Sequence, residues 1–332
     1  MPSLQSVSQL LAAAVVGVFN SLGFLLFLSP PVLAWLAWQH PYLVLAPVLA
    51  YYFRSHDGAE YKGGSPWPLF VEGFFVFRLA RDYHDLQLHL DPALEPSKMT
   101  EDDKFVFGLH PHGVLSDYRI ILDGVTREHF PKLRSWRALA ASVLFQFPLW
   151  RQLAMWSHCI DAGRATAQYA LDHGHSLFIT PGGEHEQILG EYGKEVLYLK
   201  KRMGFIKLAL RNRTPLVPTY VFGANDTFRT STFMRRTRLA IVKRLRIAVP
   251  LFWGRFGLPI PNHVPLRVVF GAPLTFDFEA DGKTSQEIAG GLREVSEEQL
   301  VAAHGTYVEA LKRLFDENKA RFGYGDRELC IV

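Results

Sequence analysis

The first 53 residues of this chain contain no Asp, Glu, Lys or Arg, and Arg54 is the first charged residue. Residues 9–28 form a largely apolar stretch of 20 residues, which Ser29-Pro30-Pro31 interrupts. Residues 32–53 then supply another 22 residues of similar character. Each stretch is long enough to cross a hydrocarbon core of ~30 Å, so the sequence predicts a membrane helical hairpin over residues 1–53.

The charges that flank this hairpin predict its orientation. Arg54 and Lys62 follow it and no cation precedes it, which places the rest of the chain in the cytosol by the positive-inside rule. The missing basic n-region and the second apolar stretch argue against a cleaved signal peptide. Two alternatives stay open: a re-entrant wedge that does not cross the bilayer, and a buried pair of helices.

Cysteine is also scarce, since Cys159 and Cys330 are the only two among 332 residues. Two distant cysteines exclude a disulfide framework and favour a reduced compartment. The His, Cys and acidic residues have no convincing metal-ligand spacing, so we predict no metal site. No Gly-x-Ser-x-Gly sequence is present, which argues against a lipid hydrolase built on a nucleophile elbow.

Acidic residues nearly disappear between positions 200 and 246, where 13 Lys or Arg residues accompany a single acid, Asp226. This block carries +12 in a chain of net charge +4, so the remaining residues carry −8. Such a block can attract anionic lipid head groups or a phosphorylated ligand, although a solvated basic face is the simpler alternative. We predict no nucleic-acid partner, because no nucleic-acid-binding module accompanies the block.

Beyond position 103, apolar residues predict strands and helices in alternation. Short apolar runs predict strands at residues 104–109, 177–180, 215–221 and 266–270. Helices are predicted at residues 139–154, 164–171, 196–210 and 298–321. Strands that alternate with helices indicate an α/β domain over residues 104–332, with at least partly parallel strands. Residues 54–103 are predicted to be a linker and interfacial segment.

Two histidines follow the first predicted strand, in His110-Pro111-His112-Gly113. Imidazole is suited to proton transfer near neutral pH, and ligands of open α/β sheets bind beyond the carboxyl ends of strands. Asp117 is close enough in sequence to orient the ring of His112 and stabilise its protonated form. The pattern predicts His110, His112 and Asp117 as catalytic residues, with structural capping or a metal site as the alternatives.

A second motif, Pro181-Gly182-Gly183, follows the strand predicted at residues 177–180. Glycine permits positive φ and exposes backbone N–H groups, so Gly182 and Gly183 could bind an anion, and Gly113 could let a ligand approach the backbone. Glu186 could orient a substrate hydroxyl or a catalytic histidine. An ordinary turn is the alternative interpretation.

Further along, Arg202 and Lys207 lie at the start of a predicted helix and could bind the phosphates of a nucleotide-like carrier. The ordered set of motifs is specific: an uncharged N-terminal segment, His-Pro-His-Gly, Pro-Gly-Gly-x-x-Glu, Arg-x-Gly-Phe-x-Lys-x-Ala, Val-Pro-x-x-x-Phe-Gly and a C-terminal helix that contains His304-Gly305-Thr306-Tyr307. This set resembles the diacylglycerol acyltransferase type 2 family, and the resemblance spans nearly the whole chain.

The resemblance implies a glycerolipid-acyltransferase-like mixed sheet flanked by helices, with residues 104–332 as the acyltransferase domain. It implies acyl transfer from acyl-CoA, as a co-substrate and without a cofactor, to a glyceride hydroxyl at the endoplasmic reticulum and lipid droplets. Diacylglycerol, monoacylglycerol and a long-chain alcohol stay open as acceptors, and so does a homo-oligomer. The His-Pro-His-Gly of the family falls on His110 to Gly113, and its Pro-Gly-Gly glutamate on Glu186.

The expected mechanism uses His112 as general base, oriented by Asp117, with His110 polarising the thioester carbonyl or sharing the base role. Glu186 would position the acceptor or a histidine. Backbone N–H groups near Gly182 and Gly183 would stabilise the oxyanion. Arg202 and Lys207 would hold the CoA phosphates. The alternative from another class is a non-catalytic protein that binds membrane or lipid-droplet lipids.

Overall fold

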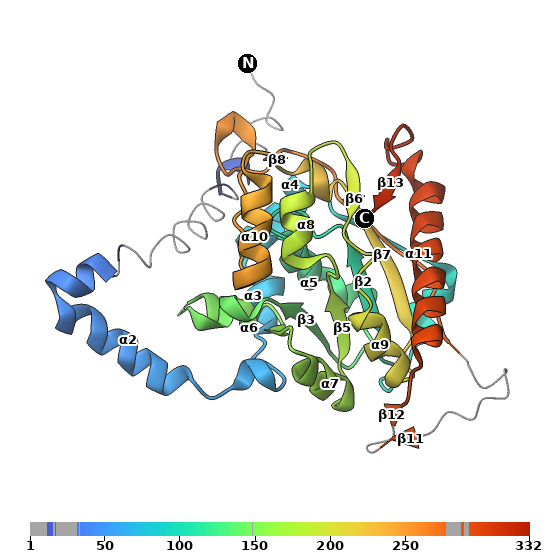
Figure 1. Cartoon of the computed structure of the whole chain (residues 1–332), viewed down its shortest axis with the longest axis horizontal. Coiled ribbons are helices and arrows are strands. Elements are labelled where there is room, and N and C mark those ends of the chain that lie inside the picture. Colours follow the sequence, from blue (N-terminus) through green and yellow to red (C-terminus); the bar gives the residue numbers. More distant parts are fainter. Residues whose placement is uncertain are drawn as a thin grey trace.

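The computed structural model describes residues 12–15, 17, 32, 34–147, 149–276, 287–288 and 292–332. Its centre is a seven-stranded sheet, shown in Figure 1. The strands are β1 (Gln87–Leu90), β2 (Val106–His110), β3 (Trp136–Ala140), β4 (Cys159–Asp161), β5 (Ser176–Ile179), β7 (Leu216–Phe222) and β10 (Arg267–Phe270). They lie in the order β1-β10-β7-β2-β5-β3-β4.

The sheet is mixed. Strands β7, β2, β5, β3 and β4 run parallel to one another, whereas β10 is antiparallel to β7 and parallel to β1. The carboxyl ends of the five parallel strands therefore meet at one edge, where an open α/β sheet binds its ligands. The mixed sheet flanked by helices agrees with that part of the predicted fold.

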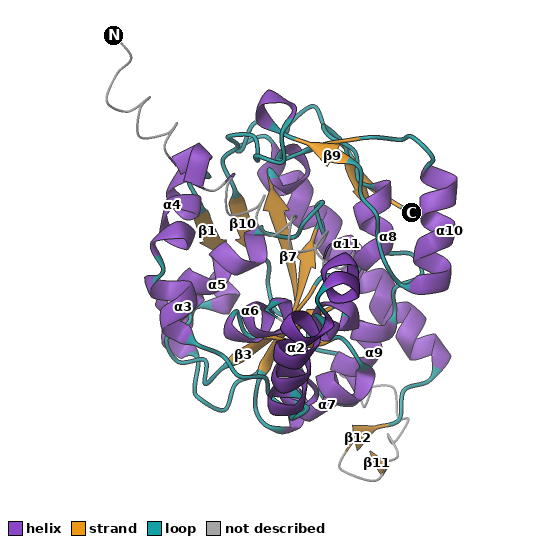
Figure 2. Ribbon diagram, turned by 90° about the vertical axis from the view of Figure 1, so that its left-hand side faces the viewer, coloured by secondary structure: helices purple, strands orange, loops and turns teal. Residues whose placement is uncertain are grey.

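Helices cover both faces of the sheet (Figures 1 and 2). One face packs against α3 (Pro68–Gly73), α4 (Phe75–Tyr83), α5 (Tyr118–His129) and α6 (Trp150–Trp156). The other face packs against α7 (Arg164–Asp172), α9 (Gly204–Arg211) and α11 (Glu297–Lys319). Helix α8 (Gly183–Leu189) follows β5 directly, and α10 (Arg235–Leu245) packs against α8.

The central strands are apolar because both of their faces are buried. In β5, Phe178 points into the cluster beneath α5, while Leu177 and Ile179 point into the cluster beneath α7 and α9. Side chains alternate between the faces of a strand, so a continuous apolar run is what a doubly covered parallel sheet requires. These runs explain why the predicted strands at residues 177–180, 215–221 and 266–270 agree closely with β5, β7 and β10.

Smaller elements complete the fold. They are α2 (Pro41–Ser55), β6 (Glu195–Leu197), β8 (Arg229–Thr230), β9 (Phe252–Trp253), β11 (Glu287–Ile288), β12 (Leu292–Arg293) and β13 (Leu329–Ile331), with short 3-10 helices between them. Strand β13 pairs with β6, so the C-terminus packs against the segment that follows α8. There Arg327 bonds Glu195 and Asp226, each at 2.8 Å.

The prediction of an N-terminal membrane hairpin is wrong. Among the described residues, none of the helices combines the length and the apolar character that crossing a bilayer demands. Helix α2 has 15 residues and rises about 22 Å, short of a hydrocarbon core of ~30 Å. Helix α2 starts at Pro41, because a proline disfavours the helical conformation of the residue before it, here His40. Most of the first predicted leg, residues 9–28, lies outside the described residues.

Two predicted helices are also wrong in part. The apolar stretch at residues 139–154 contains the end of β3, a 3-10 helix (Ser142–Gln146) and the start of α6. Residues 196–210 contain most of β6, a turn and α9. In both cases apolar residues at helical spacing belong to two elements that face the same core, and spacing alone does not distinguish that arrangement from one helix.

Candidate active site

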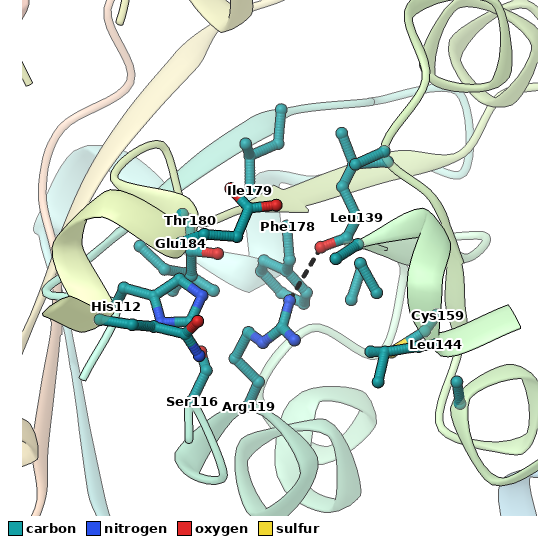
Figure 3. Close-up of a pocket in the computed structure, with 18 of the residues that line it drawn as sticks. His112, Ser116, Arg119, Leu139, Leu144, Cys159, Phe178, Ile179, Thr180 and Glu184 are labelled. Atoms are coloured by element: carbon teal, nitrogen blue, oxygen red, sulfur yellow. Dashed lines mark hydrogen bonds between the residues drawn. The ribbon is translucent and has the colours of Figure 1, made fainter. Parts of the chain in front are cut away.

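A cavity of about 1430 Å³ opens at the carboxyl edge of the parallel strands. Its inner part is apolar and is lined from α4, α5, α6, the 3-10 helix Ser142–Gln146 and strands β3 and β5. The lining there includes Phe77, Leu122, Leu139, Leu144, Leu153 and Phe178. A large apolar chamber with a few polar groups is the usual form of a small-molecule or lipid site. Figure 3 shows the region where the polar groups meet this chamber.

His112 is the imidazole that faces the cavity (Figure 3). Its Nδ1 lies 3.0 Å from the carbonyl oxygen of Gly113. A carbonyl can only accept, so Nδ1 carries the proton and Nε2 is left as a lone-pair acceptor. Burial, followed by the charge on Arg119, lowers the pKa of His112 to about 4. The ring is therefore neutral at physiological pH and can accept a proton at Nε2.

Glu186 lies behind this turn and is buried at 2% exposure. Its carboxylate accepts hydrogen bonds from two backbone amides, those of His112 at 2.5 Å and Tyr198 at 2.8 Å. Burial raises the pKa of Glu186 to about 7. The carboxylate contacts the backbone of His112 and does not line the cavity, so it supports the turn rather than a substrate.

Gly182 is required by the same carboxylate. A Cβ at this position would lie 2.1 Å from the Oε2 atom of Glu186, far inside the contact distance. The next residue, Gly183, has a φ of +54°, in the left-handed region that favours glycine. The Pro-Gly-Gly sequence therefore leaves space for Glu186 and turns the chain into α8. The N–H of Gly183 donates to the carbonyl of Thr180 at 3.2 Å.

His110 is completely buried and does not line the cavity. Its Nε2 lies 3.0 Å from the hydroxyl of Tyr307 on α11, and burial lowers its pKa to about 3. Gly108 makes this contact possible, because a Cβ there would lie 2.0 Å from the Tyr307 oxygen. The two histidines thus face different environments: His112 faces the cavity, and His110 joins β2 to α11.

Asp117 lines the cavity and forms the N-cap of α5, where its side chain accepts from the amide of Tyr118 at 3.1 Å. Burial raises its pKa. Among the hydrogen bonds of the described residues, the expected one from the His112 ring to Asp117 is absent. The proton on Nδ1 of His112 is donated to the carbonyl of Gly113 instead. At the same turn, Gly113 has a φ of +67° and Tyr118 donates to the carbonyl of Pro111 at 2.7 Å.

Cations surround the outer part of the cavity. They come from α7, the turn before α9, α9 itself and the segment after α10, and comprise Arg164, Lys201, Arg202, Lys207, Arg211 and Arg246. Arg202 donates to the carbonyl of Gly182 at 3.1 Å, contacts His185, and lies over the ring of Tyr198. Lys207 is exposed, so its ammonium is available to an anionic ligand. The two predicted phosphate-binding residues therefore lie at one opening.

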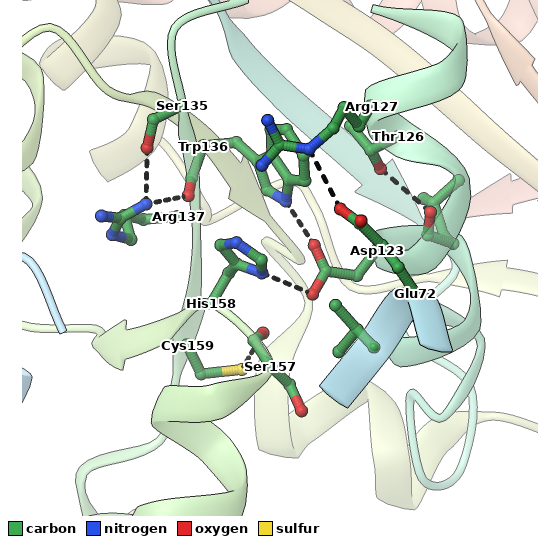
Figure 4. A network of polar contacts seen from close by, with 12 residues as sticks. Glu72, Asp123, Thr126, Arg127, Ser135, Trp136, Arg137, Ser157, His158 and Cys159 are labelled. Atoms are coloured by element: carbon green, nitrogen blue, oxygen red, sulfur yellow. Dashed lines mark hydrogen bonds and ion pairs between the residues drawn. The ribbon is translucent and has the colours of Figure 1, made fainter. Parts of the chain in front are cut away.

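Two features of the cavity wall were not predicted. Arg119, in the first turn of α5, projects into the cavity, and its helix was missed because residues 118–129 mix polar and apolar side chains. A buried pair, Asp123 and His158, lies deeper, with Oδ2 to Nδ1 at 2.8 Å (Figure 4). Trp136 donates its indole N–H to the same carboxylate. The residues of this pair are 35 apart in sequence, so only the fold joins them.

Cys159 lines the cavity beside this pair. Burial raises the pKa of its thiol to about 11, so the thiolate required of a nucleophile is disfavoured at neutral pH. Among the described residues, no three His, Cys, Asp or Glu side chains are grouped as metal ligands. The wall that faces the ligand space therefore offers a neutral imidazole, carboxyl groups and cations.

A sequence model of diacylglycerol acyltransferases matches residues 33–332, which is nine-tenths of the chain. The chain belongs to the diacylglycerol acyltransferase family. This membership makes it an acyltransferase and confirms the family resemblance drawn from the motifs. The matched residues include the whole sheet, the His-Pro-His-Gly turn and the cations of the cavity opening.

Several relatives in this acyltransferase family cover most of the chain. It is 31% identical to human 2-acylglycerol O-acyltransferase 3 over 268 residues, which are 75% of this chain and 72% of that protein. It is 29% identical to bovine diacylglycerol O-acyltransferase 2 over 308 residues, 87% of this chain and 80% of that protein. Bovine 2-acylglycerol O-acyltransferase 1 is 28% identical over 93% of this chain and 92% of its own length.

Proposed function

We propose that this enzyme transfers a fatty acyl group from acyl-CoA to the free hydroxyl of diacylglycerol, with His112 as the general base. The observation that carries the proposal is the cavity: an apolar chamber, a neutral imidazole on its wall and cations at its opening. An acyl chain suits the chamber, and the phosphates of CoA suit the cations. A thioester is already activated, so the proposed reaction needs no cofactor.

The hydrogen bond from Nδ1 to Gly113 supports the role of His112. It fixes the ring with the lone pair of Nε2 toward the cavity, where the acceptor hydroxyl would lie. Nε2 takes the hydroxyl proton as the oxygen attacks the thioester carbon, and then gives it to the departing thiolate. The low pKa keeps the base unprotonated at rest and favours release of the proton to sulfur in the second half of the reaction.

The proposed roles of the other site residues follow from their contacts. Glu186 holds the backbone of His112 and thereby positions the base. Asp117 lies at the cavity wall, close to the expected place of the acceptor, and caps α5. His110 is proposed to position the turn through Tyr307 instead of polarising the thioester, since it does not face the cavity.

The test is acyl transfer by purified protein with labelled acyl-CoA and a panel of acceptors. Diacylglycerol should be converted to triacylglycerol, and replacing His112 with Ala should lower kcat by about 10²–10⁴-fold. A His112→Gln variant, which keeps a polar side chain without a basic nitrogen, should lose as much. Near-normal turnover in either variant would contradict the assignment, and release of free fatty acid without an acceptor would indicate hydrolysis.

Monoacylglycerol is the second candidate acceptor. Two of the relatives are named for 2-acylglycerol, at 31% and 28% identity, so sequence similarity does not separate the two glycerides. The acceptor panel distinguishes them, because the preferred glyceride should give the higher kcat/KM. A protein that only binds lipids would give no turnover with any acceptor.

The endoplasmic reticulum membrane is the proposed location, with the catalytic domain in the cytosol, and lipid droplets are a further proposed site. The support is chemical: both substrates are lipids, and α2 exposes large apolar side chains, among them Tyr42, Leu43 and Phe53. Co-fractionation of the full chain with microsomes and with floating lipid droplets tests this proposal. Recovery in the soluble fraction alone would oppose it.

A further inference from the structure

Arg119 is a cation on the inner side of the cavity, next to the catalytic imidazole. It lies in the first turn of α5, and its guanidinium extends between His112 and the end of β3 (Figure 3). Its Nη1 donates to the carbonyl of Leu139 at 2.9 Å. That carbonyl lies one residue past Ala138, the last β3 residue in register with β5, so Arg119 binds β3 where its pairing with β5 ends and only its pairing with β4 continues.

The guanidinium retains unused donors. Within the described part of the chain, the Nε of Arg119 is buried and has no hydrogen-bond partner. A guanidinium carries five N–H donors in a fixed plane, and one bond to Leu139 orients that plane without exhausting it. Nη2 makes no hydrogen bond within the described residues and, unlike Nε, is not enclosed, so it is the donor that an acceptor atom of a ligand in the cavity can reach.

Several backbone amides that could serve the same purpose are already engaged. The amide of Gly183 donates to Thr180. In the first turn of α5, the amide of Tyr118 donates to Asp117 and that of Arg119 donates to Ser116. The negative charge that develops during acyl transfer needs a donor close to the base, and the arginine side chain is available there.

We propose that Arg119 is a catalytic residue that donates a hydrogen bond to the carbonyl oxygen of the bound thioester and stabilises the oxyanion formed from it. This inference rests on the proposed acyl transfer, and it assigns the oxyanion to a side chain instead of to the Gly182–Gly183 backbone. It also explains why a cation is kept beside an apolar chamber, where a charge without a partner is costly.

The proposed acyl transfer proceeds through a tetrahedral intermediate. The acceptor oxygen forms a bond to the thioester carbon, its proton passes to Nε2 of His112, and the carbonyl π electrons move to the oxygen that Arg119 binds. The oxyanion then collapses, the carbon–sulfur bond breaks, and the CoA thiolate takes the proton from Nε2. The products are the new ester and CoA thiol, and both side chains return to their starting states.

The electrostatics agree with this geometry. The positive charge on Arg119 contributes to the low pKa of His112 and also acts on Tyr118 and Cys159, so its field covers this wall of the cavity. In the tetrahedral intermediate, the oxyanion would lie between a guanidinium and an imidazolium. At rest His112 is neutral and Arg119 is the only one of the two that is charged. Both positive charges attract the oxyanion once the proton has moved to His112, which is the differential stabilisation that catalysis requires.

The first test measures binding, which does not depend on turnover. The probes are palmitoyl-CoA and hexadecyl-CoA, a thioether of matched chain length that lacks the carbonyl oxygen. The wild-type protein should bind the thioester several-fold more tightly than the thioether, and in Arg119→Gln the ratio of the two Kd values should approach one. An equal ratio in both proteins would overturn the proposal.

The second test measures turnover and pH dependence. Arg119→Gln should lower kcat by about 10²–10³-fold, the usual effect of removing one oxyanion donor, and KM for acyl-CoA should rise by no more than the several-fold loss in thioester binding. Arg119→Lys should recover part of kcat. Loss of the cation should also move the acid limb of the kcat/KM profile of Arg119→Gln to higher pH, because the pKa of His112 rises. Arg313→Gln, at an exposed position on α11, is the charge-matched control and should behave as wild type.

A purely structural Arg119 would give a different pattern: lower thermal stability, no recovery with Lys and an unmoved acid limb. That pattern would overturn the proposal. Failure of the proposed function is distinguishable, because wild-type protein would then transfer no acyl group to any acceptor, while the thioester-to-thioether Kd ratio would still report whether Arg119 contacts the carbonyl.

Discussion

At the scale of single residues, the site depends on a carboxylate that touches no substrate. Glu186 receives the amides of His112 and Tyr198, which belong to segments far apart in sequence. Two backbone donors share one buried side chain, so the position of the His112 turn depends on both carboxylate oxygens. The Gly182 backbone lies against the same carboxylate, so a larger residue there acts on the base indirectly.

We expect Glu186→Gln to weaken both the fold and catalysis. A glutamine offers one acceptor oxygen and one NH₂ donor, so one of the two amides loses its acceptor and meets a donor. A buried unsatisfied group costs about 1–3 kcal/mol, and kcat should fall because the turn that carries His112 moves. Chemical denaturation and steady-state kinetics measure the two effects.

Gly182→Ala should produce the same phenotype by a different route, because its Cβ would displace the Glu186 carboxylate. The control is Gly305→Ala in α11, where a new Cβ meets nothing within 4 Å. Alanine favours a helix interior over glycine, so the control should be neutral or slightly stabilising. Full activity and stability in Glu186→Gln and Gly182→Ala would show that the turn does not need this support.

At this scale the sequence predicted residues that the structure places together, but not the contacts that they make. The motifs identified His110, His112, Asp117 and Glu186, and all four lie at the carboxyl edge of β2 or beside it. Their partners were not predictable, because hydrogen bonds to Gly113, Tyr198 and Tyr307 depend on how separate segments come together. His110 and Tyr307 are 197 residues apart, and no periodicity connects them.

At the scale of elements, three segments bring cations to one opening. Helix α7 supplies Arg164, the segment from Lys201 to Arg211 supplies most of the others, and Arg246 follows α10. The sequence predicted the basic block at residues 200–246. It did not predict α5 or α10, because their mixed polar and apolar residues lack the clear periodicity of α11.

We expect replacement by Gln to change KM and kcat differently at Lys207 and at Arg202. Lys207 is exposed at the opening, so Lys207→Gln should raise KM for acyl-CoA by several-fold, with kcat nearly unchanged and a weaker dependence on salt. Arg202 also bonds the carbonyl of Gly182, so Arg202→Gln should raise KM and lower kcat together. Kinetics at two ionic strengths, with dephospho-CoA thioesters for comparison, measure the effect. Identical KM values in Lys207→Gln and wild type would remove Lys207 from the binding role.

At the scale of the whole molecule, the fold buries titratable groups within its core. His110 joins β2 to α11, and His112 lies at the cavity. Burial lowers the pKa of His110 from 6.5 to about 3 and that of His112 from 6.5 to about 4. The sequence predicted the α/β class from its apolar runs, but not which polar groups the two layers of helices would enclose. Burial of these histidines makes stability depend on pH.

The sign of that dependence follows from proton binding. Below pH 6.5 the unfolded chain protonates these two imidazoles, whereas the folded chain does so only near pH 3 to 4. The unfolded state therefore binds more protons between these limits, and the stabilisation present above pH 6.5 is lost progressively as the pH falls. For His110 alone, the loss at pH 5 should be about 2 kcal/mol, on the order of 1.4 kcal/mol for each pH unit below 6.5.

His110→Gln isolates this contribution, because its amide can donate to the Tyr307 hydroxyl and does not titrate. At pH 7.5 the variant should be less stable than wild type, since it packs less well at a completely buried position. As the pH falls to 5, the difference should narrow by about 2 kcal/mol, because only wild type incurs the cost of excluding a proton from His110. Free energies of unfolding from denaturant titrations at several pH values measure this difference. The other titrating groups contribute equally to wild type and variant, so their contributions cancel. A difference that stays constant from pH 7.5 to 5 would mean that His110 takes up its proton equally in the folded and unfolded chain, and that the contact with Tyr307 tolerates the charge.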